Sequence, residues 1–421
     1  MVIPGKLEDI QGLLDNSPVM NNRSVHYLAE ISGDDYFVLK TAWQALNNAY
    51  EKNGHVWATD IFAGSASLDW NNASYIIFLA NLALEGLTKI AGSGEQTEAW
   101  RNVKGSALFM RACTQYQLAQ IFCKTYMPGS AASDPGIPLR MDSDMTIKTV
   151  RATVEETYRQ IVKDMKEAAE LLPLTPSAKT RPSRPAANAH LARVYLQMQD
   201  YENALNHASL SWKEYNTLID YNTLDSLANY PFKLFNEEVI FHSNIPILVI
   251  LNRSRHSVSP ELYDSYDKDD LRKVCYYTPA SGRVQYKGSY TGSNTFFTGI
   301  STGEVLVIMA ECYARLGKIP EAVSSLNQLL HTRYKRGTFE TVDVKEGELL
   351  DFVLKERRKE LPFRGIRWSD LKRLNLDPRF AKSISRVWED ETITLEPGSD
   401  RYVLPIPDQV IKLTGIEQNV R

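Results

Sequence analysis

The sequence KERRKELPFRGIRWSDLKRL (Lys355–Leu374) combines charge, an aromatic pair and a glycine more densely than any other part of the chain. Its basic residues are interleaved with acids on a helical pattern, which argues against a stripe of cations that binds phosphates. The arginines can pair with Glu356, Glu360 or Asp370 through two parallel hydrogen bonds, and the indole of Trp368 can stack on a guanidinium. We therefore predict a buried structural clasp here, and not a catalytic centre or a nucleic-acid patch.

An internal repeat lies upstream of this clasp. AHLARVYLQMQDYENAL (Ala189–Leu205) and VIMAECYARLGKIPEAV (Val307–Val323) align with a constant offset. Three pairs of positions carry the alignment: Ala192 with Ala310, Tyr195 with Tyr313, and Ala204 with Ala322. Two small residues with a tyrosine between them allow two antiparallel helices to approach closely, as in a tetratricopeptide helix pair. The chain keeps no constant period of about 34 residues, so long loops are expected to interrupt the repeats.

Hydrophobic periodicity predicts a mainly α-helical protein with long loops and a short β-hairpin. The hairpin is expected between EEVIFHS (237–243) and ILVIL (247–251), which are rich in β-branched residues. We expect 1–235 to form an N-terminal region of helix pairs, and 236–421 to complete the same compact fold. The predicted helices span residues 35–52, 71–91, 98–125, 153–172, 184–199, 201–215, 301–317, 319–333 and 345–361.

Composition excludes several classes of protein. The chain has 421 residues and a formal net charge of −3, with both signs spread along it, so nucleic acid is not an expected partner. The longest apolar run, Ile76–Leu84, is shorter than the roughly 20 residues that cross a bilayer. The four cysteines form no C-x-x-C pair, and Cys113 and Cys312 are predicted to be small core residues.

No catalytic or metal-binding motif appears in the sequence. The seven histidines never share a helix face at metal-ligand spacing, and neither a phosphate-binding glycine loop nor a G-x-S-x-G elbow is present. The acidic loops MDSDM (141–145) and DKDD (267–270) lack a full set of calcium ligands and are interpreted as solvated turns. We therefore predict no catalytic residues, no metal site, no cofactor and no enzyme activity.

Aromatic residues on loops are the candidate ligand surface. Six rings lie between Tyr276 and Phe297, in a segment rich in Gly, Ser and Thr. Exposed rings present flat apolar faces to sugars, although such rings equally anchor a loop onto a scaffold. A second candidate is HVWATD (55–60), which offers a ring and an acceptor. The predicted ligand-binding residues are Trp57, Asp60, Tyr276, Tyr277, Tyr286 and Tyr290.

The clasp resembles the C-terminal signature of the SusD/RagB family, in which E-R-x-x-E-L runs into a glycine turn and R-W-x-D-L-x-R. Arg364 departs from the pattern, since the family usually has Glu before the glycine, so one local ion pair is expected to differ. The matching residues are Glu356, Arg357, Glu360, Leu361, Phe363, Gly365, Arg367, Trp368, Asp370, Leu371 and Arg373.

Further blocks follow in the family's order and support the resemblance. They include WNNASYIIFLAN (70–81), GSALFMRACTQYQLAQIF (105–122), GIPLR (136–140), TVEETYRQIVKDMKEAAELLP (153–173) and YVLPIPDQVIKLTGIEQNV (402–420). Some positions differ, such as Gln115 where the family has Tyr and Thr414-Gly415 where it has Asn-Pro. The six blocks span roughly 350 residues, which makes coincidence improbable.

The resemblance implies a SusD-like α/α superhelix and a surface glycan-binding lipoprotein of the outer membrane. Such a protein covers a SusC-like TonB-dependent transporter and delivers glycan to it. The lipid anchor and its signal are expected ahead of this sequence in the full-length protein. Three alternatives remain open: a RagB-like protein with peptide cargo, a cytoplasmic tetratricopeptide adaptor that binds peptide tails, and an all-helical glycoside hydrolase.

Overall fold

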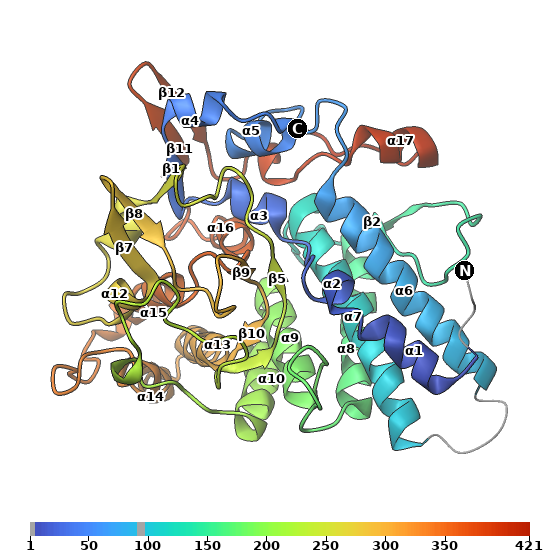
Figure 1. The fold of residues 1–421 in the computed structure, drawn as a ribbon, viewed down its shortest axis with the longest axis horizontal. Helices are drawn as coiled ribbons and strands as arrows, with labels where there is room; N and C mark the ends of the chain where they lie inside the picture. Colours follow the sequence, from blue (N-terminus) through green and yellow to red (C-terminus); the bar gives the residue numbers. More distant parts are fainter. Residues whose placement is uncertain (1–4, 91–96) are drawn as a thin grey trace.

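The computed structural model describes residues 5–90 and 97–421, and helices make up most of the ordered structure (Figure 1). The long helices pack in chain order from α6 to α10, and α13 then joins α10. This confirms the predicted mainly α architecture. The long helices are α6 (Leu68–Ile90), α7 (Glu98–Phe122), α8 (Val154–Leu171), α9 (Arg184–Gln197), α10 (Tyr201–Glu214), α13 (Thr302–Arg315), α14 (Ile319–Leu330) and α15 (Glu346–Glu360).

Short helices connect and cover this array. α1 lies across α6 at one side of the molecule, and α16 packs against α3, α7 and α9 near its centre (Figure 1). Of these short helices, only α4 and part of α5 fall within a helix predicted from the sequence. They are α1 (Leu7–Leu14), α2 (Ser17–Met20), α3 (Tyr27–Ser32), α4 (Lys40–Gln44), α5 (Ala49–His55), α11 (Pro260–Tyr263), α12 (Arg272–Tyr276), α16 (Arg367–Leu374) and α17 (Asp408–Thr414), with 3₁₀ turns at Tyr221–Thr223 and Asp400–Tyr402.

Eight of the nine predicted helices are present, with each described end within three residues of its prediction. Residue 91, the predicted end of one of them, lies outside the described residues. Side-chain caps explain several of the starts. Thr153 accepts a hydrogen bond from the Glu156 amide at 3.1 Å, and Glu156 accepts one in return from the Thr153 amide at 2.9 Å. Such a capping box stabilises a helix by about 1 kcal/mol.

The internal repeat forms two helix pairs, α9 with α10 and α13 with α14. The small residues that were aligned are fully buried in these helix pairs. α10 also packs against α13, so the two pairs form one continuous array. The repeat prediction is therefore confirmed. The four buried alanines are Ala192, Ala204, Ala310 and Ala322.

The predicted helix at 35–52 is wrong. Tyr36–Val38 forms strand β1, which pairs antiparallel with β6 (His256–Val258), and α4 and α5 follow as separate helices. Aromatic and β-branched residues suit the pairing, and Asn47-Asn48 interrupts the helical pattern before α5.

The predicted hairpin between 237–243 and 247–251 is also wrong, since the second segment contains no strand. β4 (Val239–Phe241) pairs with β10 (Ile300–Ser301), and β5 (Asn244–Ile245) pairs with β9 (Phe296–Phe297). The pairings join residues about 60 and about 50 positions apart in the chain, which local sequence patterns do not encode.

Two hairpins occur elsewhere, and a short pair, β2 (Pro135–Pro138) with β3 (Arg151–Thr153), lies beside α8. β7 (Tyr277–Ala280) and β8 (Arg283–Tyr286) join through Ser281-Gly282, both with positive φ. β11 (Ile384–Trp388) pairs with β12 (Glu391–Leu395). Arg386 of β11 donates to the carbonyl of Gly33 at 2.8 Å and to that of His55 at 2.9 Å, at the C-terminal ends of α3 and α5. The hairpin thus binds two N-terminal helices.

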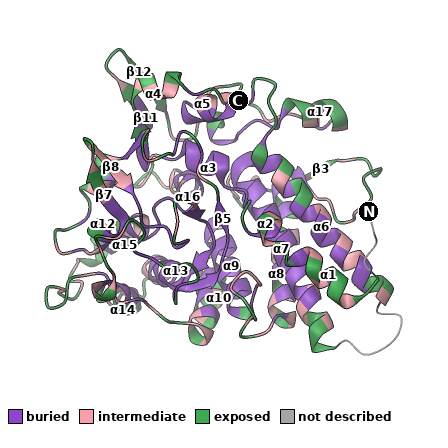
Figure 2. Cartoon of the chain, in the orientation of Figure 1, coloured by how far each residue is buried: buried purple, intermediate pink, exposed green. Residues whose placement is uncertain are grey.

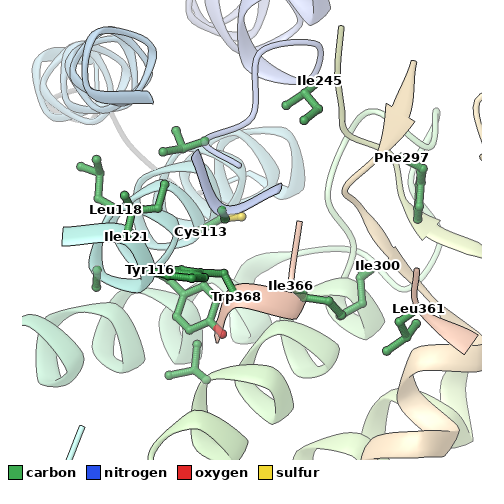
Figure 3. Close-up of a cluster of buried hydrophobic side chains, with 14 of the residues drawn as sticks. Cys113, Tyr116, Leu118, Ile121, Ile245, Phe297, Ile300, Leu361, Ile366 and Trp368 are labelled. Atoms are coloured by element: carbon green, nitrogen blue, oxygen red, sulfur yellow. The ribbon is translucent and has the colours of Figure 1, made fainter. Parts of the chain in front are cut away.

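One large apolar core runs through the molecule, and buried residues fill the centre of Figure 2. Residues of α7 such as Tyr116 and Leu118 join Trp368 of α16 in this core (Figure 3). Cys113 and Cys312 are buried free thiols, which confirms their prediction as core residues.

α6 is the one described helix that is long and apolar enough to span a membrane by length and composition. Half of its most apolar window is buried inside the protein, and the helix packs against α1 and α7. Core helices of folded domains have the same properties, so its composition by itself is weak evidence of a membrane span.

Candidate functional site

The aromatic segment that was predicted to face a ligand is buried. Tyr276, Tyr277, Tyr286 and Tyr290 expose at most 4% of their surface. The hydroxyls of Tyr276 and Tyr290 find a partner inside the protein, because the Tyr221 hydroxyl lies 2.8 Å from the first and 2.7 Å from the second. A ring without an exposed face cannot stack on a sugar. The prediction that these four rings contact ligand is therefore wrong, and they anchor the segment to the scaffold.

Trp57 and Asp60 have different surroundings. Trp57 is fully buried, its indole N–H donates to the Ser32 carbonyl at 3.0 Å, and the Arg386 guanidinium lies 4.5 Å from its ring centre. Its prediction as a ligand residue is wrong for the same reason. Asp60 is exposed and accepts a hydrogen bond from the Ala63 amide at 2.8 Å. Its role in binding stays a prediction.

Most of the clasp, Lys355–Leu374, is buried and held by ion pairs, as predicted. Glu360 binds Arg333 at 2.7 Å and Arg272 at 3.2 Å, and Glu356 binds Arg272 at 2.6 Å. Arg333 also binds Glu238 at 2.8 Å. Although burial raises the pKa of Glu360, Arg333 and Arg272 hold it below its usual value. Both arginines and Glu238 come from outside the clasp, so this network joins four segments that are distant in the chain.

Two further expectations need correction, one for the clasp and one for the loop DKDD (267–270). Trp368 packs against Tyr402, with ring centres 4.8 Å apart and planes inclined at 30°, and not on a guanidinium. Asp270 was interpreted as part of a solvated turn, but it is buried and binds Arg272 at 2.7 Å. Asp270 therefore belongs to the ion-pair network.

Arg364, which departs from the family pattern, has an apolar environment. Its guanidinium lies 4.1 Å from the ring centre of Tyr290 and 4.9 Å from that of Phe297. It donates to the Ser301 hydroxyl at 3.2 Å, and among the described residues it makes no ion pair with a carboxylate. The expected change in a local ion pair is thus realised as cation–π contacts.

A second buried group of ion pairs, centred on Glu311, predicts a specific pH dependence of stability. Arg373 and Arg315 bind Glu311, the latter at 2.9 Å, and although burial opposes them they lower the pKa of Glu311 to about 2. A lowered pKa means that the ionised carboxylate stabilises the folded state above its unfolded pKa of about 4.3. That stability is lost as the pH falls toward 2. Glu311→Gln should therefore cost about 3 kcal/mol at pH 7 and much less near pH 2.

Urea unfolding of both proteins between pH 7 and pH 2 measures this convergence. A difference between Glu311→Gln and wild type that stays constant over the range would show that the carboxylate charge contributes nothing.

An open groove on the surface is a better candidate site than the buried rings. Its volume is about 430 Å³, in the range of small-ligand sites, and β1, α11 and β11 provide its walls. Phe37 is 40% exposed and Val387 is 71% exposed, so both offer apolar faces. We call it the Phe37 groove. Its lining is Asp34, Tyr36, Phe37, Ser259–Glu261 and Lys382–Val387.

Charged groups in the Phe37 groove are fixed by one another. Asp34 binds Arg367 at 2.6 Å, and Lys382 bridges Asp34 at 3.2 Å and Glu261 at 2.6 Å. Burial raises the pKa of Asp34, but Arg367 and Arg358 hold it well below its usual value. The carboxylates are therefore ionised and oriented at neutral pH, next to an exposed ring. Such an arrangement suits a ligand that has both hydroxyl groups and an apolar face.

Two half-buried tryptophans lie near the groove. Trp43 and Trp388 have ring centres 4.8 Å apart with planes inclined at 32°. Their indole N–H groups donate to the carbonyls of Lys52 at 2.8 Å and Val38 at 3.0 Å. The first bond ties α4 to α5, and the second ties β11 to β1.

The Phe37 groove was not predicted from the sequence, because its walls β1 and β11 lie about 350 residues apart in the chain. One available signal was the alternation in ISRVW and ETITL (384–395), which is typical of a hairpin with one exposed face. Another was Tyr36-Phe37-Val38, a strand-like triplet placed inside a predicted helix.

Two family models match this chain and together cover most of it. Residues 3–196 match a SusD-like model described as "Starch-binding associating with outer membrane", and residues 263–420 match the SusD family model that includes RagB. The chain belongs to the SusD/RagB family. The first match includes α1 to α8 and nearly all of α9. The second includes the clasp together with Arg272 and Arg333, so most of the ion-pair network lies within it.

Relatives and solved structures agree with this membership of the SusD/RagB family. SusD-like protein P2 of Formosa agariphila is 24% identical over 82% of this chain and 78% of its own length. A SusD superfamily protein of Bacteroides thetaiotaomicron has a TM-score of 0.79 at 22% identity, covering 99% of this chain and 100% of that one. A putative sugar binding protein of Bacteroides vulgatus reaches 0.80 at 21% identity, covering 100% of this chain and 99% of that one. These likenesses confirm the fold.

Proposed function

We propose that this chain binds glycan at the cell surface and delivers it to a SusC-like transporter. Membership of the SusD/RagB family supports the proposal, because one matching model is described as starch-binding and outer-membrane associated. A solved structure with the same fold is named as a surface glycan-binding protein, from Bacteroides fluxus, with a TM-score of 0.74 at 16% identity over 99% of both chains. The proposed activity is binding without turnover.

The lining of the Phe37 groove is the observation that supports placing the ligand there. A sugar ring presents one face of C–H groups and a rim of hydroxyls. Phe37 supplies an exposed ring for the face, and Glu261, Lys382 and Ser385 supply acceptors and donors for hydroxyls. The charged side chains are already held by ion pairs, so little conformational entropy is lost when a ligand binds to them.

Phe37→Ala should weaken glycan binding about fivefold, which corresponds to roughly 1 kcal/mol for loss of one aromatic contact. A glycan array on purified protein first identifies a bound polysaccharide, and isothermal titration of its oligosaccharides then measures the affinity. Tyr75→Ala is the matched control, because Tyr75 is 45% exposed on α6 and lies outside the groove. Equal affinities of Phe37→Ala and wild type would place the ligand elsewhere, and release of free sugars from the polysaccharide would contradict binding without turnover.

Delivery to a transporter and a lipid anchor belong to the same proposal. A TonB-dependent channel encoded beside this protein is the expected partner, and co-purification of the two from detergent-solubilised outer membranes tests it. Protease treatment of intact cells tests whether the chain is exposed at the surface. Recovery of the protein in the cytosolic fraction would favour the alternative of a peptide-binding adaptor.

A further inference from the structure

A second cavity lies on a part of the chain that does not contribute to the Phe37 groove. It has a volume of about 300 Å³ and is formed by the end of α14, the face of α15 and the loop between these helices. Three half-buried rings line it: Tyr334, Phe339 and Phe352. The rings of Tyr334 and Phe339 have centres 5.6 Å apart and planes inclined at 50°. We call this cavity the Phe339 pocket.

Four carboxylates line the same pocket. Asp267 and Asp269 come from the chain before α12, and Glu340 and Asp343 come from the loop before α15. No Lys, Arg or His side chain contributes to the lining, and within the described ranges none of the four carboxylates makes an ion pair. This differs from the Phe37 groove, where basic side chains neutralise the acids. The Phe339 pocket is thus anionic and rich in hydrogen-bond acceptors.

The walls are held in place before any ligand binds. The Lys335 amide donates to the Asp269 carbonyl at 2.9 Å, beside a β-bridge between Asp270 and Tyr334. The Val342 amide donates to the Asn327 side chain at 2.8 Å, which fixes the second acidic segment to α14. The two acidic segments therefore keep their positions on either side of the rings, as a preformed site requires.

We propose that the Phe339 pocket binds a sugar residue that carries a free ammonium group. This inference rests on the proposed glycan-binding function and adds a second site and a class of ligand to it. An ammonium group brings three donors and a positive charge to the carboxylates, and a cation near aromatic faces gains a further attraction. The apolar face of the sugar ring contacts Phe339 or Phe352, and its hydroxyls donate to the remaining carboxylates.

A lysine side chain shares the ammonium chemistry and is the competing source. It carries one cation on an apolar stem, and it offers no further donors for the other three carboxylates. An amino sugar carries donors around a rigid ring and satisfies acids on both sides of the pocket. The four acceptors therefore favour the amino sugar.

Isothermal titration of the full chain with a fully deacetylated glucosamine tetramer, at a pH below the pKa of its amine, tests the proposal. Its N-acetylated counterpart lacks the charge and should bind about tenfold more weakly. Glu340→Gln combined with Asp343→Asn should reduce affinity for the deacetylated tetramer about tenfold and leave the N-acetylated one unchanged. Both residues are exposed, so thermal unfolding should not change.

The matched control removes the same charge elsewhere. Glu170→Gln combined with Glu389→Gln alters two exposed carboxylates that line neither cavity and should preserve discrimination. The single substitution Phe339→Ala should weaken binding of the deacetylated tetramer about fivefold. Raising the salt concentration should also weaken it in wild type.

Three results would overturn the inference. The first is equal affinity for the two tetramers. The second is a loss of affinity in the control double variant as large as that in the pocket double variant. This would show that affinity depends only on the net charge of the protein. The third is binding of a lysine tetrapeptide, sensitive to the Glu340 and Asp343 changes, without binding of the sugar. If neutral glycans still bind in a Phe37-dependent manner, only this inference fails, whereas absence of all glycan binding would also remove the proposed function.

Discussion

Arg333→Met is expected to lower the free energy of unfolding by about 3–5 kcal/mol. Arg333 is fully buried and binds the carboxylates of Glu238 at 2.8 Å and Glu360 at 2.7 Å. Methionine fills similar space but leaves both carboxylates buried with fewer cationic partners. Glu360 retains Arg272 at 3.2 Å, whereas Glu238 has no other ion pair among the residues that the structure describes. Urea unfolding followed by circular dichroism measures the loss.

Arg336→Met is the matched control for this prediction. Arg336 is three residues away, its side chain is 79% exposed, and it binds Asp220 at 3.0 Å. Exposed ion pairs contribute less than about 1 kcal/mol, so this variant should resemble wild type. Similar stabilities for the two variants would contradict a structural role for the buried network.

Gly365→Ala should be the other strongly destabilising substitution, by about 3 kcal/mol. Gly365 has φ of +73°, a conformation that costs an L-residue free energy, and a Cβ there would lie 2.6 Å from His26 Cβ. Its amide also donates to Glu30 Oε2 at 2.7 Å, so the backbone has little freedom to shift. Thermal unfolding of the purified variant measures the effect.

Gly398→Ala separates the two contributions. Gly398 has φ of +78°, but a Cβ there meets no atom within 4 Å. It should cost about 1 kcal/mol, which is the conformational part alone. If both variants lost the same free energy of unfolding, the close contact between His26 and Gly365 would contribute nothing to the destabilisation by Gly365→Ala.

The sequence predicted those parts of the fold that depend on local signals. Helices such as α8 have an amphipathic pattern and side-chain caps such as Thr153, and their predicted bounds agree with the structure. Elements that depend on distant partners were missed. β1 pairs with β6 about 220 residues away, and β4 pairs with β10 across a long excursion, so no local window contains either pairing.

The candidate site was less predictable, for a related reason. Tyr276 and Tyr290 lie in a Gly- and Ser-rich segment that suggests exposure, but Tyr221 and Glu238 satisfy their hydroxyls and permit burial. Burial of a polar ring depends on partners that the sequence does not identify. The clasp was predictable because its acids and bases are close in the chain. Its partners Arg272 and Arg333 are distant in the chain and were identified only in the structure.

The two hydrogen bonds from Arg386 to the ends of α3 and α5 also bear on how the protein matures. Translation produces His55 first, and the guanidinium that binds its carbonyl follows 331 residues later. The carbonyls of Gly33 and His55 therefore lack this hydrogen-bond donor until nearly the entire polypeptide has left the ribosome. Premature termination ahead of β11 would deprive the earliest helices of their final partner, so a shortened product should be a substrate for quality-control proteases and not a partly working protein.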